Sequence, residues 1–394
     1  MKVSSFEISV PQSQIDDLHR RLDQTRWSPV PDGAGWQYGI DATVLHEFCD
    51  FWRTRFDWRA AEAQINAHDH CIVDIEEGVP LHFMHVRGRG RTVLPLIVSH
   101  GWPWTFWDWH ALIGPLTDPA AHGLDDALAF DLVIPSLPGF GFSQPLHRRG
   151  ITAPRIADMM DRLMRRVLGY ERYCAAGGDW GAFVTWELGT RYAAKLHGIY
   201  LSFPPIWHVG GVEGMAGLSY AASEAEWHAK TMRRWQNAIS HLTVHSRDHM
   251  TLAFALADSP VGLAAWLLER RRNWGDGNDL FAMFDMDFLA TTVSIYWYTQ
   301  TIGSSMQLYA EQFRAGSASD TNYTAGPPPR IEAPTAIGVY PGELVLMPRS
   351  ACESVANLQD WKVLARGGHF APAENPQAYS AELLRVFAGP LAPR

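Results

Sequence analysis

The sequence predicts an α/β protein whose central sheet is mostly parallel and carries helices on both faces. Apolar strand-like runs alternate with stretches of helical spacing, and Gly-rich turns follow several of these runs. The clearest example is the stretch 177–181, Gly-Gly-Asp-Trp-Gly, which joins a strand-like run to a helical one. With 394 residues, 47% of them hydrophobic, the chain is long enough for one large domain with additions.

Changes in this alternation divide the chain into four parts. We predict a helical N-terminal extension, a first part of the sheet, an inserted helical cap and a second part of the sheet, at residues 1–70, 71–206, 207–314 and 315–394. The cap is rich in Trp, Met and Tyr and shows no strand pattern. A polar linker rich in Gly, Ser and Pro, at residues 315–330, leads back to the sheet.

Each element of the sheet has a local sequence signal. Strands are expected where β-branched and apolar residues cluster between turn residues, at 71–75, 81–86, 94–99, 130–134, 172–176, 196–203, 335–339 and 361–364. Helices are expected where apolar residues recur at helical spacing, from Pro11, over 42–56, from Phe106, and over 152–168, 182–195 and 376–387.

The composition excludes several classes of protein. Net charge is −9 and the cations form no long basic run, so we expect no nucleic-acid partner. No apolar stretch resembles a signal peptide or a membrane span, and we expect a soluble, cytoplasmic protein. Four scattered cysteines without a Cys-x-x-Cys pair fit reduced thiols. No Gly-x-Gly-x-x-Gly, P-loop or Gly-x-Ser-x-Gly motif occurs, which argues against dinucleotide-binding, nucleotide-binding and serine-esterase functions. We expect neither a cofactor nor a metal.

Asp179 is the candidate nucleophile. Small residues on both sides of a central side chain are typical of a strained strand-to-helix turn that holds a nucleophile over the edge of a sheet. A carboxylate there can attack an sp³ carbon and form an alkyl ester, which water then cleaves. An ordinary Gly-rich loop with a helix-capping Asp is the alternative.

A histidine and an acid should follow the nucleophile along the chain. His369 lies in a Gly-flanked loop after the last predicted strand, and Glu343 lies after the strand before it. We predict His369 as the base and Glu343 as the acid that orients it. Glu353 and Asp360 are the rival acids.

Residues 100–103, His-Gly-Trp-Pro, form a turn after the strand 94–99. We predict that the amides of Trp102 and Trp180 form an oxyanion hole. The peptide bond before Pro103 is a candidate cis bond. We predict substrate contacts from Trp104, Phe142 and Tyr298, with core packing as the alternative for the Trp-rich stretch.

Together these motifs resemble the microsomal type of epoxide hydrolase, within the α/β-hydrolase superfamily. The resemblance covers nearly the whole chain and includes Arg26-Trp27, residues 56–59 and residues 257–263 as well as the turns around Trp102, Asp179 and His369. It implies the same nucleophile, base and acid. The N-terminal membrane anchor of the microsomal members has no counterpart here, which favours a soluble relative. Cap-bearing hydrolases can pair, so a homodimer is one expectation.

The resemblance also implies two cap tyrosines that hydrogen-bond the epoxide oxygen. One corresponds to Tyr309, whereas the position of the other holds His241. A histidine can donate the same hydrogen bond, and we expect His241 to do so. His241, His245 and His249 also share a helical spacing, but without a carboxylate cluster a packed or solvated face is favoured over a metal site.

The sequence therefore predicts an epoxide hydrolase that forms vicinal diols from small apolar epoxides in detoxification. Haloalkane or haloacid dehalogenases use the same Asp-His-acid logic and are the first alternative. Tyr309 argues against them, because a halide departs without a proton. A non-catalytic binding protein with the hydrolase fold is the second alternative, and it would need none of the three triad residues.

Overall fold

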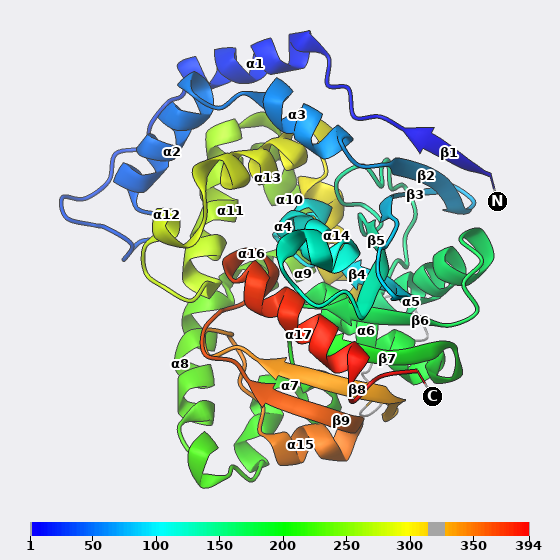
Figure 1. Cartoon of the computed structure of the whole chain (residues 1–394). Coiled ribbons are helices and arrows are strands. Elements are labelled where there is room, and N and C mark those ends of the chain that lie inside the picture. The colour runs from blue at the N-terminus through cyan, green and yellow to red at the C-terminus, as the bar shows by residue number, and fades with distance from the viewer. Residues whose placement is uncertain (1, 314–327, 394) are drawn as a thin grey trace.

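The computed structural model describes residues 2–313 and 328–393. Those residues include a nine-stranded sheet with the strand order β1-β2-β3-β5-β4-β6-β7-β8-β9 (Figure 1). The strands are β1 (Val3–Phe6), β2 (His70–Glu76), β3 (Val79–Val86), β4 (Thr92–Ser99), β5 (Leu128–Pro135), β6 (Tyr173–Gly177), β7 (Leu196–Leu201), β8 (Ile331–Val339) and β9 (Ala356–Val363).

From β5 to β9 every neighbouring pair of strands is parallel, whereas β1, β2, β3 and β5 pair antiparallel. The predicted mostly parallel α/β sheet is thus confirmed. The carboxyl ends of parallel strands meet at one edge, where loops from β4, β6, β8 and β9 can bring side chains together. Strand β1 was not predicted, because its four residues are largely exposed and show no alternation.

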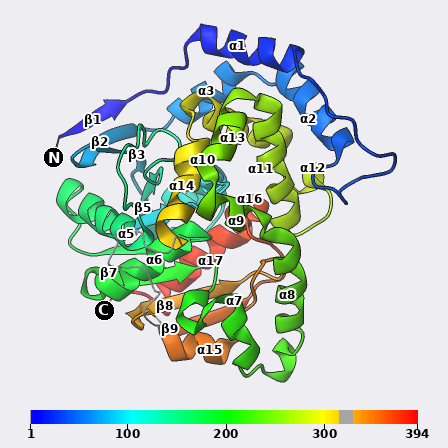
Figure 2. The same cartoon turned by 180° about the vertical axis from the view of Figure 1, so that it is seen from behind.

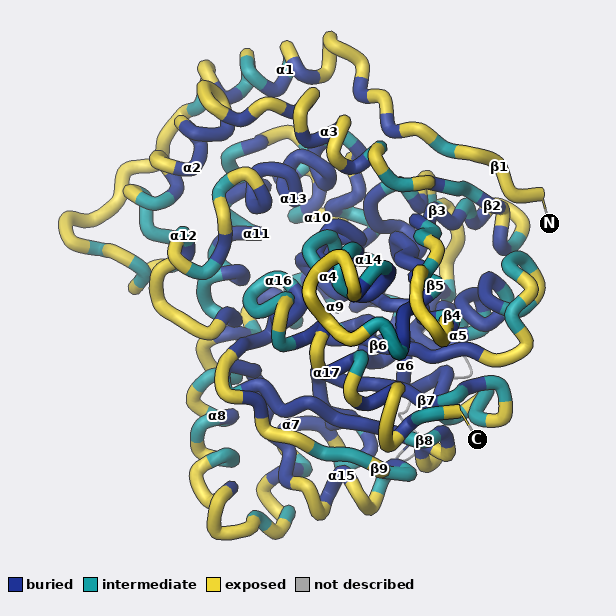
Figure 3. Tube along the Cα trace, viewed as in Figure 1, coloured by how far each residue is buried: buried dark blue, intermediate teal, exposed yellow. Residues whose placement is uncertain are grey.

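Helices cover both faces of the sheet. On one face α4 (His110–Thr117) packs against α17 (Pro376–Ala388), with the short α16 (Ala371–Glu374) beside them. On the other face α5 (Ala153–Arg162) packs against α6 (Trp180–Arg191), which contacts β4, β6, β7 and β8. Figure 2 shows the second layer from behind, and Figure 3 shows that the central strands between the layers are buried.

The chain between β7 and β8 forms a helical segment, residues 206–313, without a strand. Its α-helices are α7 (Gly211–Gly214), α8 (Trp227–Ala238), α9 (Ser240–Arg247), α10 (His249–Asp258), α11 (Pro260–Trp274), α12 (Leu280–Met283), α13 (Met286–Thr299) and α14 (Ile302–Phe313). Helix α14 packs against α9 and α10. The predicted linker 315–330 lies mostly outside the described residues.

The N-terminal extension packs on the helical segment. Its helices are α1 (Gln12–Asp23), α2 (Ala42–Thr54) and α3 (Trp58–Asn66), and they contact α11 and α13 across the top of Figure 1. Two contacts span most of the chain. The Trp52 indole donates a 2.8 Å hydrogen bond to Ser294 Oγ, and Arg21 pairs with Asp258 at 2.8 Å.

The described residues include all four cysteines and the helices that could be tested as membrane spans. All four cysteines are free thiols, as predicted. No single described helix has the length and apolar character of a membrane span, although α10 and α11 reach that threshold as a pair bent by 119°.

Candidate active site

Asp179 occupies a strained turn between β6 and α6. Its φ is 48°, one of two positive values among the described non-glycine residues. The turn needs small neighbours: a Cβ on Gly181 would collide with the carbonyl of Ser99. The strand-turn-helix structure predicted for this motif is therefore present. Backbone strain of this kind aims the carboxylate above the sheet edge.

The carboxylate of Asp179 is held by the turn that follows β4. The Trp102 amide donates a 2.7 Å hydrogen bond to Asp179 Oδ1. A Cβ on Gly101 would overlap that same oxygen, so only glycine lets the two turns approach this closely. The peptide bond between Trp102 and Pro103 is cis, as the sequence suggested. Of the two predicted oxyanion donors, the Trp102 amide already points at the carboxylate.

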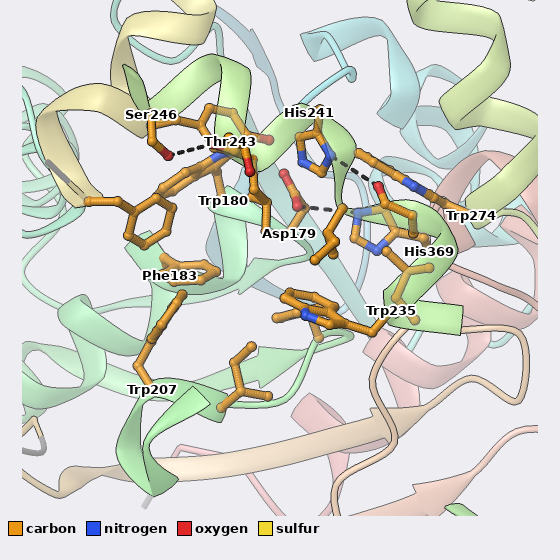
Figure 4. Close-up of a pocket in the computed structure, with 18 of the residues that line it drawn as sticks. Asp179, Trp180, Phe183, Trp207, Trp235, His241, Thr243, Ser246, Trp274 and His369 are labelled. Carbon is orange, nitrogen blue, oxygen red and sulfur yellow. Dashed lines mark hydrogen bonds and ion pairs between the residues drawn. The ribbon is translucent and has the colours of Figure 1, made fainter. Parts of the chain in front are cut away.

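His369 lies between the carboxylates of Glu343 and Asp179, and Figure 4 shows its contact with Asp179. Its Nδ1 donates a 2.7 Å hydrogen bond to Glu343 Oε1, and its Nε2 lies 3.3 Å from Asp179 Oδ2. The His369 backbone amide donates to the carbonyl of Trp274, the last residue of α11, at 3.1 Å. The structure thus brings together the nucleophile, base and acid predicted from the sequence.

The charges of these groups control the state of the imidazole. Burial alone would lower the pKa of His369, but the carboxylates of Glu343 and Asp179 outweigh burial and raise the pKa to about 10. The side chains of His369 and Glu343 are 1% and 3% exposed, whereas that of Asp179 is 16% exposed. At neutral pH the imidazole is a buried cation, and Asp179 is the most exposed of the three groups.

The rival acids lie elsewhere. Glu353 pairs with Arg349 at 2.8 Å, and Asp360 pairs with Arg385. Glu343 receives a second hydrogen bond, 2.5 Å long, from the amide of Leu344. Glu343 Oε1 thus accepts from both the Leu344 amide and His369, which fixes the orientation of the carboxylate.

A cavity of about 410 Å³ opens above Asp179 and His369. Its wall is predominantly aromatic and aliphatic, and most of it comes from the helical segment and from α6 (Figure 4). The aromatic lining residues other than Tyr309 and His241 are Trp180, Phe183, Phe203, Trp207, Trp235, Trp274 and Phe313. Apart from Trp180 these were not predicted, because they are spread over more than 130 positions without a shared motif. A wall of this kind suits an apolar ligand.

Tyr309, from α14, lines the same cavity as Asp179. Burial, followed by the negative charge of Asp179, holds its pKa well above the usual value, so its hydroxyl stays protonated. The Trp180 ring packs edge-on against that of Tyr309, with 4.8 Å between the ring centres. The hydroxyl proton of Tyr309 remains available to a ligand.

His241, from α9, also lines the cavity, and its ring stacks on Trp102 at a centroid distance of 5.5 Å. Its Nδ1 lies 3.1 Å from the carbonyl of Ala238, which can only accept a hydrogen bond. Burial, followed by the charge of Arg270, lowers its pKa well below the usual value. Neutral His241 therefore carries its proton on Nδ1 and has a lone pair on Nε2. The position agrees with the sequence-based expectation, but this tautomer opposes the expected donor role.

His245, one turn further along α9, is a neighbour that the sequence analysis did not assign to the site. Its ring lies 4.8 Å from that of Tyr309 and 4.5 Å from that of Trp102. Its Nε2 accepts a 3.1 Å hydrogen bond from the indole of Trp266. Its spacing of four residues from His241 is visible in the sequence, but only the fold reveals its contact with Tyr309. No three described His, Cys, Asp or Glu residues are grouped so as to hold a metal ion.

Three predicted substrate contacts are wrong, because none of these residues lines the cavity. Trp104 packs behind His369, at a ring distance of 5.9 Å. Phe142 packs among Phe6, His82 and Phe106, on the side of β2 and β3. Tyr298 packs on Trp58 of the N-terminal extension, 4.8 Å between ring centres.

The turn after β4 is anchored to the helical segment by a buried ion pair. Arg271 of α11 contacts Asp108 at 2.6 Å, and both side chains are at most 1% exposed. Arg271 also donates to the carbonyl of Pro103, and Tyr296 of α13 donates to that of Trp104 at 2.8 Å. These contacts fix the backbone that presents the Trp102 amide.

Comparison with known proteins agrees with this geometry. Residues 3–109 match the family model "Epoxide hydrolase N terminus", and residues 95–213 match the model of the alpha/beta hydrolase fold. The chain is 36% identical to a candidate epoxide hydrolase of Stigmatella aurantiaca, over 98% of this chain and 84% of that protein. It is 30% identical to epoxide hydrolase 1 of Sus scrofa, over 98% and 88% of the two chains. The crystal structure of juvenile hormone epoxide hydrolase from the silkworm Bombyx mori superposes with a TM-score of 0.88 at 25% identity, covering 99% of this chain and 95% of that one.

Proposed function

Because the chain belongs to the epoxide hydrolase family, which converts epoxides to diols through an ester on the enzyme, we propose that Asp179 is the residue that forms this ester. The observation that carries the proposal is the continuous set of contacts from Glu343 through His369 to Asp179, with Tyr309 lining the same apolar cavity. This arrangement supplies an attacking carboxylate and a proton donor on opposite sides of a bound epoxide.

The first step opens the ring. Asp179 Oδ1 is held by the Trp102 amide, so Oδ2 is the oxygen that attacks an epoxide carbon and Oδ1 becomes the ester carbonyl. The carbon–oxygen bond of the ring breaks, and the departing oxygen takes a proton or a strong hydrogen bond from the Tyr309 hydroxyl. A halide would need no such donor, which favours an epoxide over a haloalkane.

The second step cleaves the ester. Water attacks the acyl carbon of Asp179 and passes a proton to His369 Nε2, while Glu343 holds the imidazole through Nδ1. The amides of Trp102 and Trp180 stabilise the oxyanion on Oδ1. Collapse of the intermediate releases the diol with the former Oδ2, and the oxygen of water stays in the carboxylate.

The base becomes available at the step that needs it. In the free enzyme His369 is held protonated by two carboxylates, with its pKa raised to about 10. Alkylation turns Asp179 into a neutral ester and removes one of the two charges, so the pKa of His369 falls. The imidazole can then lose its proton and act on water.

The surroundings of the site support narrower proposals. The helical segment forms most of the cavity wall and acts as a cap over the nucleophile, and the aromatic wall favours apolar, aryl-bearing epoxides. Detoxification of such epoxides in the cytoplasm would suit this wall and the four free thiols. Cell fractionation followed by assay with a panel of aryl and alkyl epoxides tests these points.

A single-turnover reaction with an aryl epoxide in ¹⁸O-labelled water tests the mechanism. The first turnover should place unlabelled enzyme oxygen in the diol and ¹⁸O in a peptide that contains Asp179, both measured by mass spectrometry. A diol that carries solvent oxygen in the first turnover would overturn the assignment of Asp179.

A further inference from the structure

A second cavity, of about 600 Å³, lies between α8, α11 and the loop that joins α1 to α2. Figure 1 shows α11 beside that loop and α8 below α11, on the left of the molecule. Four cations line it: Lys230, Arg233 and Arg234 from α8 and Arg272 from α11. The cavity is separate from the active site in chemistry, because its wall is polar and cationic rather than aromatic.

These cations have no carboxylate partner. Most of the arginines described in the structure lie within 4 Å of an acid, but among the described residues none of these four does. The one acidic side chain in the cavity wall, Glu269, is engaged by Arg270. The chain as a whole carries a net charge of −9, yet four cations without a carboxylate partner gather around this one cavity. Its local charge is therefore opposite to that of the whole chain.

The cations are partly satisfied by backbone carbonyls, which carry no net charge. Lys230 donates to Pro341 at 2.6 Å, and Arg234 donates to the carbonyls of Gly342 and Glu343. Burial, followed by the charge of Arg234, lowers the pKa of Lys230, and Asp276 opposes this only partly. The carbonyls therefore satisfy donors of Lys230 and Arg234 without neutralising their charge.

From this arrangement we propose that the cavity is a binding site for a small molecule that carries two or more negative charges on phosphate groups. Guanidinium groups bind phosphate oxygens through paired hydrogen bonds, and the cavity offers three of them together with an ammonium and the amides of Asn237 and Asn273. A volume of 600 Å³ fits a small ligand. A ligand with a single carboxylate would neutralise only one of the four positive charges in the cavity wall.

The site lies close to the catalytic machinery. Arg234 donates to the carbonyl of Glu343, whose carboxylate holds His369. Binding itself requires no catalysis, however, so the proposal stands or fails independently of the roles given to Asp179 and His369.

Calorimetric titration of the full chain with inorganic pyrophosphate, at constant ionic strength set with sodium chloride, tests the proposal. We expect saturable binding with one site per chain, also in an Asp179→Asn variant. Arg233→Glu should weaken it by at least about tenfold, because a charged hydrogen-bond donor is replaced by a repelling group. Arg233 is exposed and makes no ion pair with the described residues, so its replacement should preserve folding, which thermal unfolding checks.

Arg166→Glu is the matched control, because Arg166 is also exposed and far from the cavity in the sequence and in the fold. It makes the same change in net charge and should leave the pyrophosphate affinity unchanged. Absent or non-saturable binding would overturn the proposal. So would equal weakening by the two variants, since it would reduce the effect to overall charge.

Discussion

The two sides of the active-site cavity hold their functional groups in different ways. On the sheet side, Asp179, His369 and Glu343 lie on tight turns and contact one another directly. On the helical side, Tyr309 and His241 lie on α14 and α9. Trp180 packs against the Tyr309 ring, and the carbonyl of Ala238 holds the proton of His241 on Nδ1. The sheet side therefore depends on contacts among catalytic groups, whereas the helical side depends on proton positions set by other residues.

Removing the nucleophile tests the sheet side most severely. Asp179→Asn keeps the shape of the side chain but lacks an attacking carboxylate, and Asn tolerates the positive φ of the turn. We expect epoxide turnover to fall by at least about 10⁴-fold, since removing a catalytic nucleophile elsewhere costs that much or more. Initial-rate assays measure this, with thermal unfolding as the control for folding. Retention of more than a hundredth of the activity would contradict the assigned role.

Removing the base should separate the two steps. In His369→Gln the attack by Asp179 can still occur, but water is no longer activated, so steady-state turnover should fall by about 10³-fold. Intact-protein mass spectrometry after mixing with an aryl epoxide should show one equivalent of ester on the enzyme. If no ester accumulates while turnover is lost, His369 acts before or during ring opening instead.

Paired substitutions on the helical side test whether one or two groups donate to the epoxide oxygen. Tyr309→Phe should slow ester formation by about 10²-fold, because the departing oxygen loses its proton donor. His241→Gln should slow it by less than about tenfold, since a neutral histidine with its proton on Nδ1 contributes no donor. Stopped-flow or quenched-flow single-turnover kinetics measure both. Equal losses would restore the donor role first expected for His241.

The smallest expected effect is a pH dependence of stability that belongs to the sheet side. The folded pKa of His369, about 10, lies above its ordinary value of 6.5. A raised folded pKa stabilises the folded state fully below pH 6.5 and loses this contribution as pH rises towards 10. Urea unfolding between pH 6 and 10 should therefore show a steeper fall in the free energy of unfolding for the wild-type chain than for His369→Gln. Parallel curves would contradict the ion-pair arrangement.

The same contrast explains what could be predicted from the sequence. The sheet, the turn around Asp179 and the loops of Glu343 and His369 were predictable. The alternation of strands and helices along the chain and the short Gly-rich motifs between them are local signals in the sequence. Tyr309 came from the family resemblance. The proton position on His241 was not predictable, since it depends on a carbonyl of the preceding helix. Trp104, Phe142 and Tyr298 were misplaced because nothing in an aromatic residue's own sequence shows which side of a sheet or helix it will face.

The contacts of the N-terminal extension have a consequence for how the protein is made. Trp52 finds its hydrogen-bond partner 242 residues later, in Ser294, and Arg21 finds Asp258 at a separation of 237. During synthesis α1, α2 and α3 leave the ribosome long before α11 and α13 are translated. Until then their apolar faces lack these contacts. The extension can close over α11 and α13 only after those helices emerge. Helices α1, α2 and α3 are thus among the last parts to complete their native contacts, and a nascent chain stalled before residue 294 would expose their apolar faces to chaperones or proteases.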